Sequence, residues 1–217
     1  MRKNLYIGLS FVVTFIVWTI AVSFIDIQAI GPRESSVGFA TINKFIHQTL
    51  GVNMTLYHIT DWLGLIPIAF MLGFALLGLV QWIKRKKLSS VDKNLFVLGV
   101  YYIFVLLVYI LFEFVVINRR PILIDGFLEA SYPSSTTMLI MTVMPTAIMQ
   151  LNSRIKNIKL KKCITIIICM FIIFMVVGRL VSGVHWFSDI VGGALISTGL
   201  VLLYNYFVKI IIKKMYN

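Results

Sequence analysis

Residues 163–184 read CITIIICMFIIFMVVGRLVSGV, and this stretch decides the class of fold. Arg179 is the single charged residue in it. An α-helix needs about 20 consecutive, mainly apolar residues to cross the hydrocarbon core of a bilayer. The stretch therefore predicts a transmembrane helix.

Five further apolar runs of comparable length lie along the chain, at residues 5–24, 62–83, 95–117, 136–151 and 190–212. The run at 136–151 is short and contains Pro145, which a helix bundle tolerates where neighbouring helices satisfy the freed carbonyl. Together the six runs predict an all-α, polytopic membrane protein. We expect six transmembrane helices in a bundle that forms one membrane-embedded domain over residues 1–217.

The composition agrees with a membrane protein. Hydrophobic residues make up 59% of the chain and charged residues 13%, against about 25% charged residues in soluble domains. A soluble fold of 217 residues could not bury this much apolar surface.

The net charge of +12 raises the question of a nucleic-acid partner, which the distribution of the basic residues argues against. Two precede the first run, five lie between the second and third, five between the fourth and fifth, and three at the C-terminal end. The positive-inside rule then places both termini in the cytoplasm. We interpret these clusters as topology signals and as anchors for anionic lipid headgroups. The first run is longer than the apolar core of a typical signal peptide, which favours a retained anchor over a cleaved signal.

The long segment 26–61 falls on the exterior side of this topology. Within it, apolar residues recur at helical spacing after Pro32, at Phe39, Ile42, Phe45, Ile46 and Leu50. The pattern predicts a short amphipathic helix at the outer surface.

Ionisable residues near transmembrane segments are costly and usually mark function. The topology brings six of them to the exterior face: Glu113, Arg119, Arg120, Arg179, His185 and Asp189. Taken singly, each has a simpler explanation, such as an arginine reaching the headgroups or an aspartate capping a helix. Their convergence on one face favours a site.

These residue types suit a phosphate ligand. Arginines hold phosphoryl oxygens with paired donors. The helix predicted to begin after Pro133 offers free N–H groups and the hydroxyls of Ser134, Ser135 and Thr136. His185 and Asp189 are four residues apart, so a carboxylate can fix the imidazole tautomer and leave the other nitrogen free to attack.

The pattern resembles the type-2 phosphatidic acid phosphatase superfamily, which includes the vanadium haloperoxidases. Its third motif, SR-x5-H-x3-D, is matched by Arg179, His185 and Asp189, with Gly178 in place of the serine. Its first motif, K-x6-RP, is matched by Arg120-Pro121.

Two further departures bear on the chemistry of the site. Glu113 stands where the first motif has lysine. The PSGH motif reads Pro133-Ser134-Ser135-Thr136, so that a threonine occupies the place of the histidine.

The resemblance implies a mechanism for this chain. His185 would accept the phosphoryl group as a phosphohistidine, and Asp189 would orient it. Arg120 and Arg179 would hold the phosphoryl oxygens, with Ser134 and the backbone that follows it. Arg119, Ser135, Thr136 and Glu113 would complete the substrate site, and water would release phosphate. Neither a metal cluster nor a cofactor motif occurs in the sequence.

The two departures lead to two hypotheses. Thr136 cannot serve as the general acid that a departing lipid alcohol needs, which favours lipid diphosphates over monophosphates. Glu113 would pair with Arg120 or Arg179, or would stay protonated and act as a substitute acid.

Alternative functions remain open on the sequence alone. The phosphohistidine could transfer its phosphoryl group to an acceptor other than water, or the chain could be a non-catalytic lipid-phosphate binder. A transporter is disfavoured because the charges lie at one face and not near the midplane. Undecaprenyl diphosphate, phosphatidic acid and phosphatidylglycerol phosphate are all compatible substrates, and the sequence leaves the oligomeric state undetermined.

Overall fold

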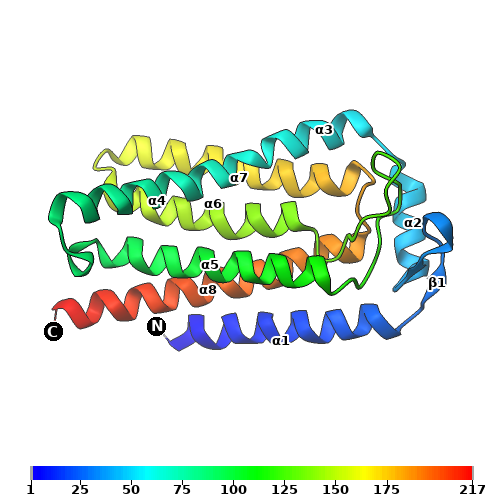
Figure 1. Ribbon diagram of the computed structural model, residues 1–217, viewed down its shortest axis with the longest axis horizontal. Coiled ribbons are helices and arrows are strands. Elements are labelled where there is room, and N and C mark those ends of the chain that lie inside the picture. The colour runs from blue at the N-terminus through cyan, green and yellow to red at the C-terminus, as the bar shows by residue number, and fades with distance from the viewer. Residues whose placement is uncertain (1, 217) are drawn as a thin grey trace.

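Long helices lying side by side form the protein, whose computed structural model describes residues 2–216 (Figure 1). Within the described residues, five helical segments are long and apolar enough to cross a membrane. They are α1 (Arg2–Phe24), the consecutive α3 (Met54–Leu63) and α4 (Leu65–Arg85), α5 (Lys93–Phe114), α7 (Ile158–Val181) and α8 (Phe187–Tyr216). The predicted helical bundle is thus confirmed. The second span, predicted at 62–83, is preceded by α3, which continues into α4 at Gly64, so that this helical segment begins at Met54.

The predicted fourth span forms α6 (Ser135–Arg154), but it is not among the helices apolar enough to qualify as a membrane span. Five of the six predicted runs are thus apolar enough to qualify by composition, and α6 is the less apolar sixth helix of the bundle. The reason is its position: α6 packs against α4, α5, α7 and α8. The polar side chains of Thr142, Thr146 and Gln150 are buried against these neighbours, so α6 does not need an apolar surface facing lipid.

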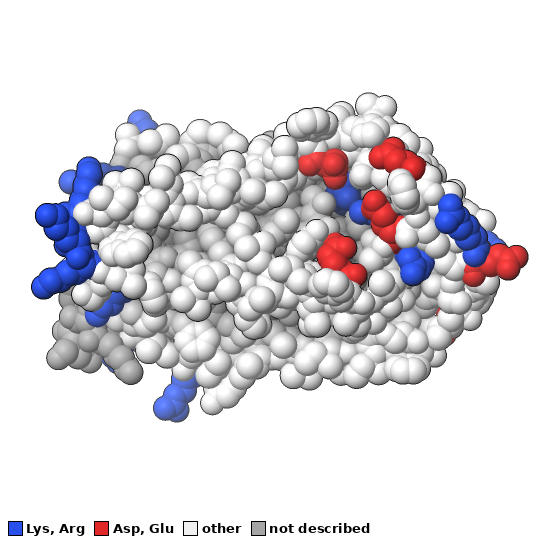
Figure 2. Space-filling view, in the orientation of Figure 1, with Lys and Arg blue, Asp and Glu red and all other residues white. Residues whose placement is uncertain are grey.

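Both ends of the described chain lie at one end of the bundle, which we call the termini end (Figure 1). Lysine and arginine side chains gather there (Figure 2). The turn from α4 to α5 lies at this end and holds a short 3-10 helix, Leu88–Ser90, and the ion pair between Arg85 and Asp92. The side chain of Lys214, part of the predicted basic cluster, lies outside the described residues.

The opposite end, which we call the site end, is capped by the segment between α1 and α3. A two-stranded hairpin, β1 (Gln28–Ala29) and β2 (Ser36–Val37), encloses a short 3-10 helix, Pro32–Glu34. The predicted amphipathic helix follows as α2 (Ala40–Leu50). Its polar Asn43 is buried against the bundle, whereas the apolar side chains of Ile42 and Phe45 are exposed.

The start of α8 packs closely on the loop that precedes α6. A Cβ atom at Gly192 would lie 2.7 Å from the ring of Tyr132, so this position requires glycine. The Tyr132 ring in turn packs against Phe15 of α1 and Phe112 of α5. This contact holds the N-terminal ends of α6 and α8 together at the site end.

Candidate active site

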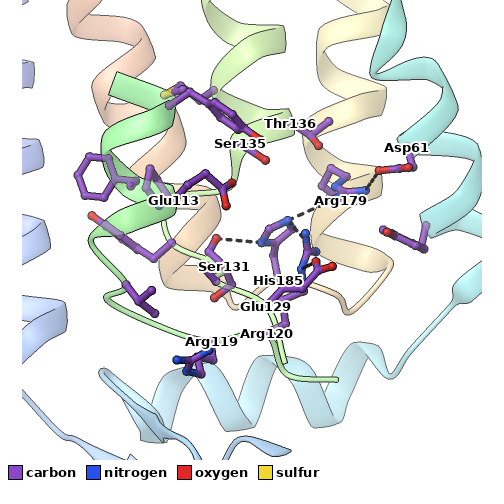
Figure 3. A pocket seen from close by; sticks show the side chains of 18 residues that line it. Asp61, Glu113, Arg119, Arg120, Glu129, Ser131, Ser135, Thr136, Arg179 and His185 are labelled. Carbon is purple, nitrogen blue, oxygen red and sulfur yellow. Dashed lines mark hydrogen bonds and ion pairs between the residues drawn. The ribbon is translucent and has the colours of Figure 1, made fainter. Parts of the chain in front are cut away.

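A cavity of about 600 Å³ opens at the site end. Its lining comes from α3, from the last turn of α5 and the loop after it, from the first turn of α6, from α7 and from the turn before α8 (Figure 3). The loop from Asn118 to Ser131 folds back on itself, with backbone hydrogen bonds joining Arg120 to Glu129 and Asn118 to Ser131. This fold-back carries Arg120 to the cavity.

His185 lies in the turn between α7 and α8 and is 3% exposed. Its Nδ1 lies 3.1 Å from the carbonyl oxygen of Ser131, so Nδ1 is assigned as the protonated nitrogen that donates this bond. Nε2 then carries the lone pair. Burial, followed by the nearby guanidinium groups of Arg120 and Arg179, holds the pKa of His185 well below its usual value, and the imidazole is neutral at pH 7.

Two guanidinium groups converge on this lone pair (Figure 3). Nη2 of Arg179 lies 3.2 Å and Nη1 of Arg120 lies 3.4 Å from Nε2 of His185. Two cations held around one neutral nitrogen repel each other. An anion bound next to Nε2 would relieve that repulsion and accept hydrogen bonds from both groups.

Arg179, in the last turn of α7, is 1% exposed. Its partners on α3 are weak: Thr60 Oγ1 at 3.5 Å, Asp61 Oδ1 at 3.6 Å and the Tyr57 ring at 5.1 Å. Its buried Nε has no hydrogen-bond partner among the described residues. A buried cation with so little compensation is expected where a ligand supplies the missing charge.

Arg120 is paired more tightly. Its Nε lies 2.9 Å from Oε2 of Glu129, and its side chain is 11% exposed. Nη1 also donates to the carbonyl oxygen of Val184 at 3.4 Å. These contacts point the remaining donors of Arg120 at the cavity.

Asp189 is completely buried on the first turn of α8. It accepts hydrogen bonds from the Trp186 N–H at 3.0 Å and from Asn118 Nδ2 at 3.3 Å. Its carboxylate lies 3.7 Å from Nδ1 of His185, which is ion-pair distance but longer than a hydrogen bond. The Ser131 carbonyl is therefore the hydrogen-bond partner that fixes the tautomer.

The first turn of α6 forms the far wall of the cavity. Ser134 is the N-cap of this helix, and its Oγ accepts a bond of 3.5 Å from the Thr137 N–H. Ser135 and Thr136 line the cavity, and the helix presents its unpaired N–H groups there.

Glu113 and Arg119 differ from the other predicted site residues. Glu113 lines the cavity, but its expected pairing with Arg120 or Arg179 is wrong, because those arginines pair with Glu129 and Asp61. Helix α5 ends at Phe114, so Arg120 lies in the loop that follows and not on the same helix as Glu113. Arg119 donates to the carbonyl oxygen of Leu128 at 3.0 Å and stands at the rim, apart from the arginines that meet at His185 (Figure 3).

Sequence reasoning missed several residues that complete the site, namely Asn43, Tyr57, Asp61, Asn118, Glu129 and Ser131. Asn43 of α2 binds Ser188 in both directions, accepting from its N–H at 3.0 Å and donating to its Oγ at 2.9 Å. Asp61 carried a usable signal, because it is an acidic residue beside a predicted span. The others lie in turns or reach the site from distant segments, and no spacing rule indicates such contacts.

The glycine that replaces the serine of the third motif has a structural reason. A Cβ atom at Gly178 would lie 2.8 Å from the methyl group of Thr60. The absence of a side chain lets α3 approach α7 closely enough to bring Thr60 and Asp61 to Arg179.

Comparison with known proteins identifies the family to which the chain belongs. A sequence model of the PAP2 superfamily matches residues 94–213, more than half of the chain. No curated protein sequence is significantly similar to this chain. Among solved structures, the chain is similar to the crystal structure of the first transmembrane PAP2 type phosphatidylglycerolphosphate phosphatase from Bacillus subtilis. The TM-score is 0.62 and the identity 22%, over 94% of this chain and 96% of that chain. The chain therefore belongs to the PAP2 superfamily and has the fold of a multi-pass membrane protein of that family.

Proposed function

We propose that the protein is a membrane lipid phosphatase that works through a phosphohistidine. The observation that carries the proposal is the lone pair of His185 Nε2, held within 3.4 Å of two guanidinium groups at the end of a cavity. Family membership supports phosphatase chemistry. A merely binding protein would gain nothing from a neutral, buried imidazole with a fixed tautomer.

In the proposed reaction, a phosphoryl group lies between the arginines and the first turn of α6. Nε2 of His185 forms the bond to phosphorus as the P–O bond to the lipid alcohol or lipid phosphate breaks and that group leaves with the bonding electron pair. The Nδ1 proton stays on the side of Ser131, where the buried carboxylate of Asp189 stabilises the positive charge that the ring acquires. Arg120, Arg179 and the N–H groups after Ser134 bind the three equatorial oxygens. Water then attacks the phosphohistidine and releases phosphate.

We further propose that lipid diphosphates are preferred to monophosphates. Thr136 lines the cavity where the family has a histidine, and a hydroxyl group is too weak an acid to protonate a leaving alkoxide. A lipid phosphate leaves as a stable anion without any proton, so it is the better leaving group even where another side chain of the cavity supplies an acid. Equal or faster turnover of a lipid monophosphate by the purified protein would contradict this preference.

The charge distribution supports an orientation in which the termini end faces the cytoplasm and the site end faces the exterior. Lysine and arginine side chains gather at the termini end (Figure 2), and the positive-inside rule assigns such clusters to the cytoplasmic side. Labelling of single cysteines introduced at Ser90 and Asp125 with an impermeant maleimide, in intact and opened cells of a Cys163→Ser, Cys169→Ser background, tests it.

The function itself is tested by phosphate release from a lipid diphosphate in detergent micelles. We expect His185→Gln to reduce turnover by about 10⁴-fold or more, because it removes the nucleophile. His58→Gln is the matched control, since His58 is exposed on α3 and does not line the cavity. If the two variants release phosphate alike, the enzyme proposal fails. A phosphorylated acceptor formed in place of free phosphate would identify a transferase.

A further inference from the structure

The reaction needs a proton for one class of substrate, and the cavity holds a candidate donor. When a phosphoryl group is removed from a lipid monophosphate, the leaving group is an alkoxide, which departs readily only if it is protonated. We propose that Glu113 is the proton donor for this step. The inference rests on the proposed phosphatase function and names a further catalytic residue for it.

Three carboxylates line the cavity, and two of them are committed to cations. Asp61 lies 3.6 Å from Arg179, and Glu129 lies 2.9 Å from Arg120. Each of these two carboxylates is thus engaged by an arginine and is not free to approach a leaving group. Glu113 takes part in none of the ion pairs among the described residues.

The position of Glu113 suits the role. It lies in the last turn of α5, between cavity-lining side chains that are apolar or aromatic, Tyr109, Phe112 and Val116. Figure 3 shows its carboxyl group directed into the cavity. A phosphate dianion bound to the two arginines would lie in the same cavity as the Glu113 carboxyl group. An ionised Glu113 would repel the same substrate.

Other proton donors in the cavity are occupied or weaker. The hydroxyl group of Tyr132 bonds to Thr19 at 2.7 Å, away from the arginines. Tyr57 packs its ring against Arg179. Tyr109 lies one helical turn before Glu113 and is the remaining competitor, although a phenol is an intrinsically weaker acid than a carboxylic acid.

The proton balance is simple. In the first step the lone pair of His185 Nε2 forms the N–P bond while the P–O bond to the lipid breaks, and the Glu113 proton passes to the leaving oxygen to give the lipid alcohol. In the second step the Glu113 carboxylate takes a proton from water, whose oxygen forms a P–O bond as the N–P bond breaks. Phosphate leaves, the electron pair returns to Nε2, and Glu113 is again protonated.

The test compares two leaving groups in the full-length protein. Phosphatidic acid releases an alcohol, which needs a proton, whereas p-nitrophenyl phosphate releases a stable phenolate, which does not. We expect Glu113→Gln to reduce kcat for phosphatidic acid by about 10²-fold and kcat for p-nitrophenyl phosphate by at most about threefold. Glu113→Asp should restore part of the loss on phosphatidic acid.

Two matched variants separate this role from general effects of a changed carboxylate or phenol. Glu129→Gln disturbs Arg120 and should reduce kcat for both substrates by similar factors. Tyr109→Phe should leave the ratio of the two kcat values unchanged. A ratio that stays constant in Glu113→Gln, or that changes in Tyr109→Phe instead, would overturn the proposal.

The proposed function fails on a different result. His185→Gln should lose both substrates, and full turnover of both by that variant would refute the phosphohistidine whatever Glu113→Gln does. A diphosphate leaves without the Glu113 proton, so Glu113→Gln should also increase the selectivity for diphosphate over monophosphate by about 10²-fold.

Discussion

Each end of the bundle holds an aspartate that accepts a hydrogen bond from a side-chain amide. The two aspartates differ in how far they are exposed to solvent. At the termini end, Asp92 accepts from Gln81 Nε2 at 2.8 Å and pairs with Arg85, with 44% of its side chain exposed. At the site end, Asp189 accepts from Asn118 Nδ2 at 3.3 Å and is completely buried. Water can replace any partner of Asp92 but none of Asp189.

The charges at the two ends therefore contribute unequally to stability and activity. The termini end holds most of the basic residues, yet its ion pairs lie in high dielectric and are screened. The site end holds few cations, and Arg179 is 1% exposed with weak partners. Substitutions of the same kind should therefore have very different effects at the two ends.

The largest effect is expected for the arginines. Arg179→Lys replaces a planar fork by a single ammonium group and should reduce phosphate release from a lipid diphosphate by about 10²- to 10³-fold. Arg85→Lys, at the termini end, should stay within about twofold of the wild type. Thermal unfolding in detergent checks that both variants fold. Similar activities of the two variants would remove the contrast between the ends.

The amide donors give the next contrast. Asn118→Ala leaves Oδ1 of the buried Asp189 with only the weak 3.4 Å bond from Ser188 Oγ, and should reduce the free energy of unfolding by about 1–3 kcal/mol. Gln81→Ala exposes Asp92 to water and should cost less than about 1 kcal/mol. Chemical denaturation in mixed micelles measures both. Equal losses would mean that burial does not separate the two aspartates.

A substitution toward the family sequence should be harmful here. Gly178→Ser would bring Cβ to 2.8 Å from the methyl group of Thr60, and overpacking of this kind costs about 1–3 kcal/mol. Adding Thr60→Ser, which removes the methyl group but keeps the hydroxyl group near Arg179, should recover most of the loss. Gly99→Ser is the control, because a Cβ atom at Gly99 would meet nothing within 4 Å. If Gly178→Ser alone is as stable as the wild type, α3 is not held as closely as described.

The smallest effect concerns pH. Burial and the two arginines hold the pKa of His185 well below 6.5, so below pH 6.5 the unfolded chain binds a proton that the folded chain refuses. Stability should therefore fall as the pH decreases from 6.5, by at most about 1.4 kcal/mol per pH unit. The pKa of Asp92 is lowered by the hydrogen bond from Gln81 and by Arg85, and its contribution is lost only in more acidic solution.

Melting temperatures at pH 7.5 and 5.5 separate the His185 contribution. The wild type should lose more stability between these pH values than His185→Gln, which has no imidazole to protonate. Identical losses would show that His185 takes up its proton over the same pH range in the folded and in the unfolded protein.

Much of the bundle could be predicted from sequence because each membrane-facing helix must be apolar over a fixed length. This requirement does not apply to α6, because other helices surround it in place of lipid. Its polar side chains Thr142, Thr146 and Gln150 are therefore buried against protein. The sequence pattern also could not predict which face of α2 points toward the bundle. Its periodicity predicts a helix, but the contact of Asn43 with Ser188 decides which face points inward.

The candidate site was predictable where its residues lie at fixed spacings in one motif, as for Arg179, His185 and Asp189. The geometry between them was not, because the turn before α8 leaves Asp189 3.7 Å from the imidazole and Ser131 supplies the hydrogen bond. Asp61 and Glu129 pair with the arginines from segments far along the chain. Such contacts depend on the fold as a whole.

The outward apolar face of α2 has a consequence for kinetics. Ile42 and Phe45 are exposed on α2, which lies at the site end, where they can rest among headgroups and acyl chains. A substrate that stays in the same layer is found by diffusion in two dimensions. Its effective concentration is then its mole fraction among the lipids, and turnover should decrease when inert detergent dilutes it at constant bulk concentration.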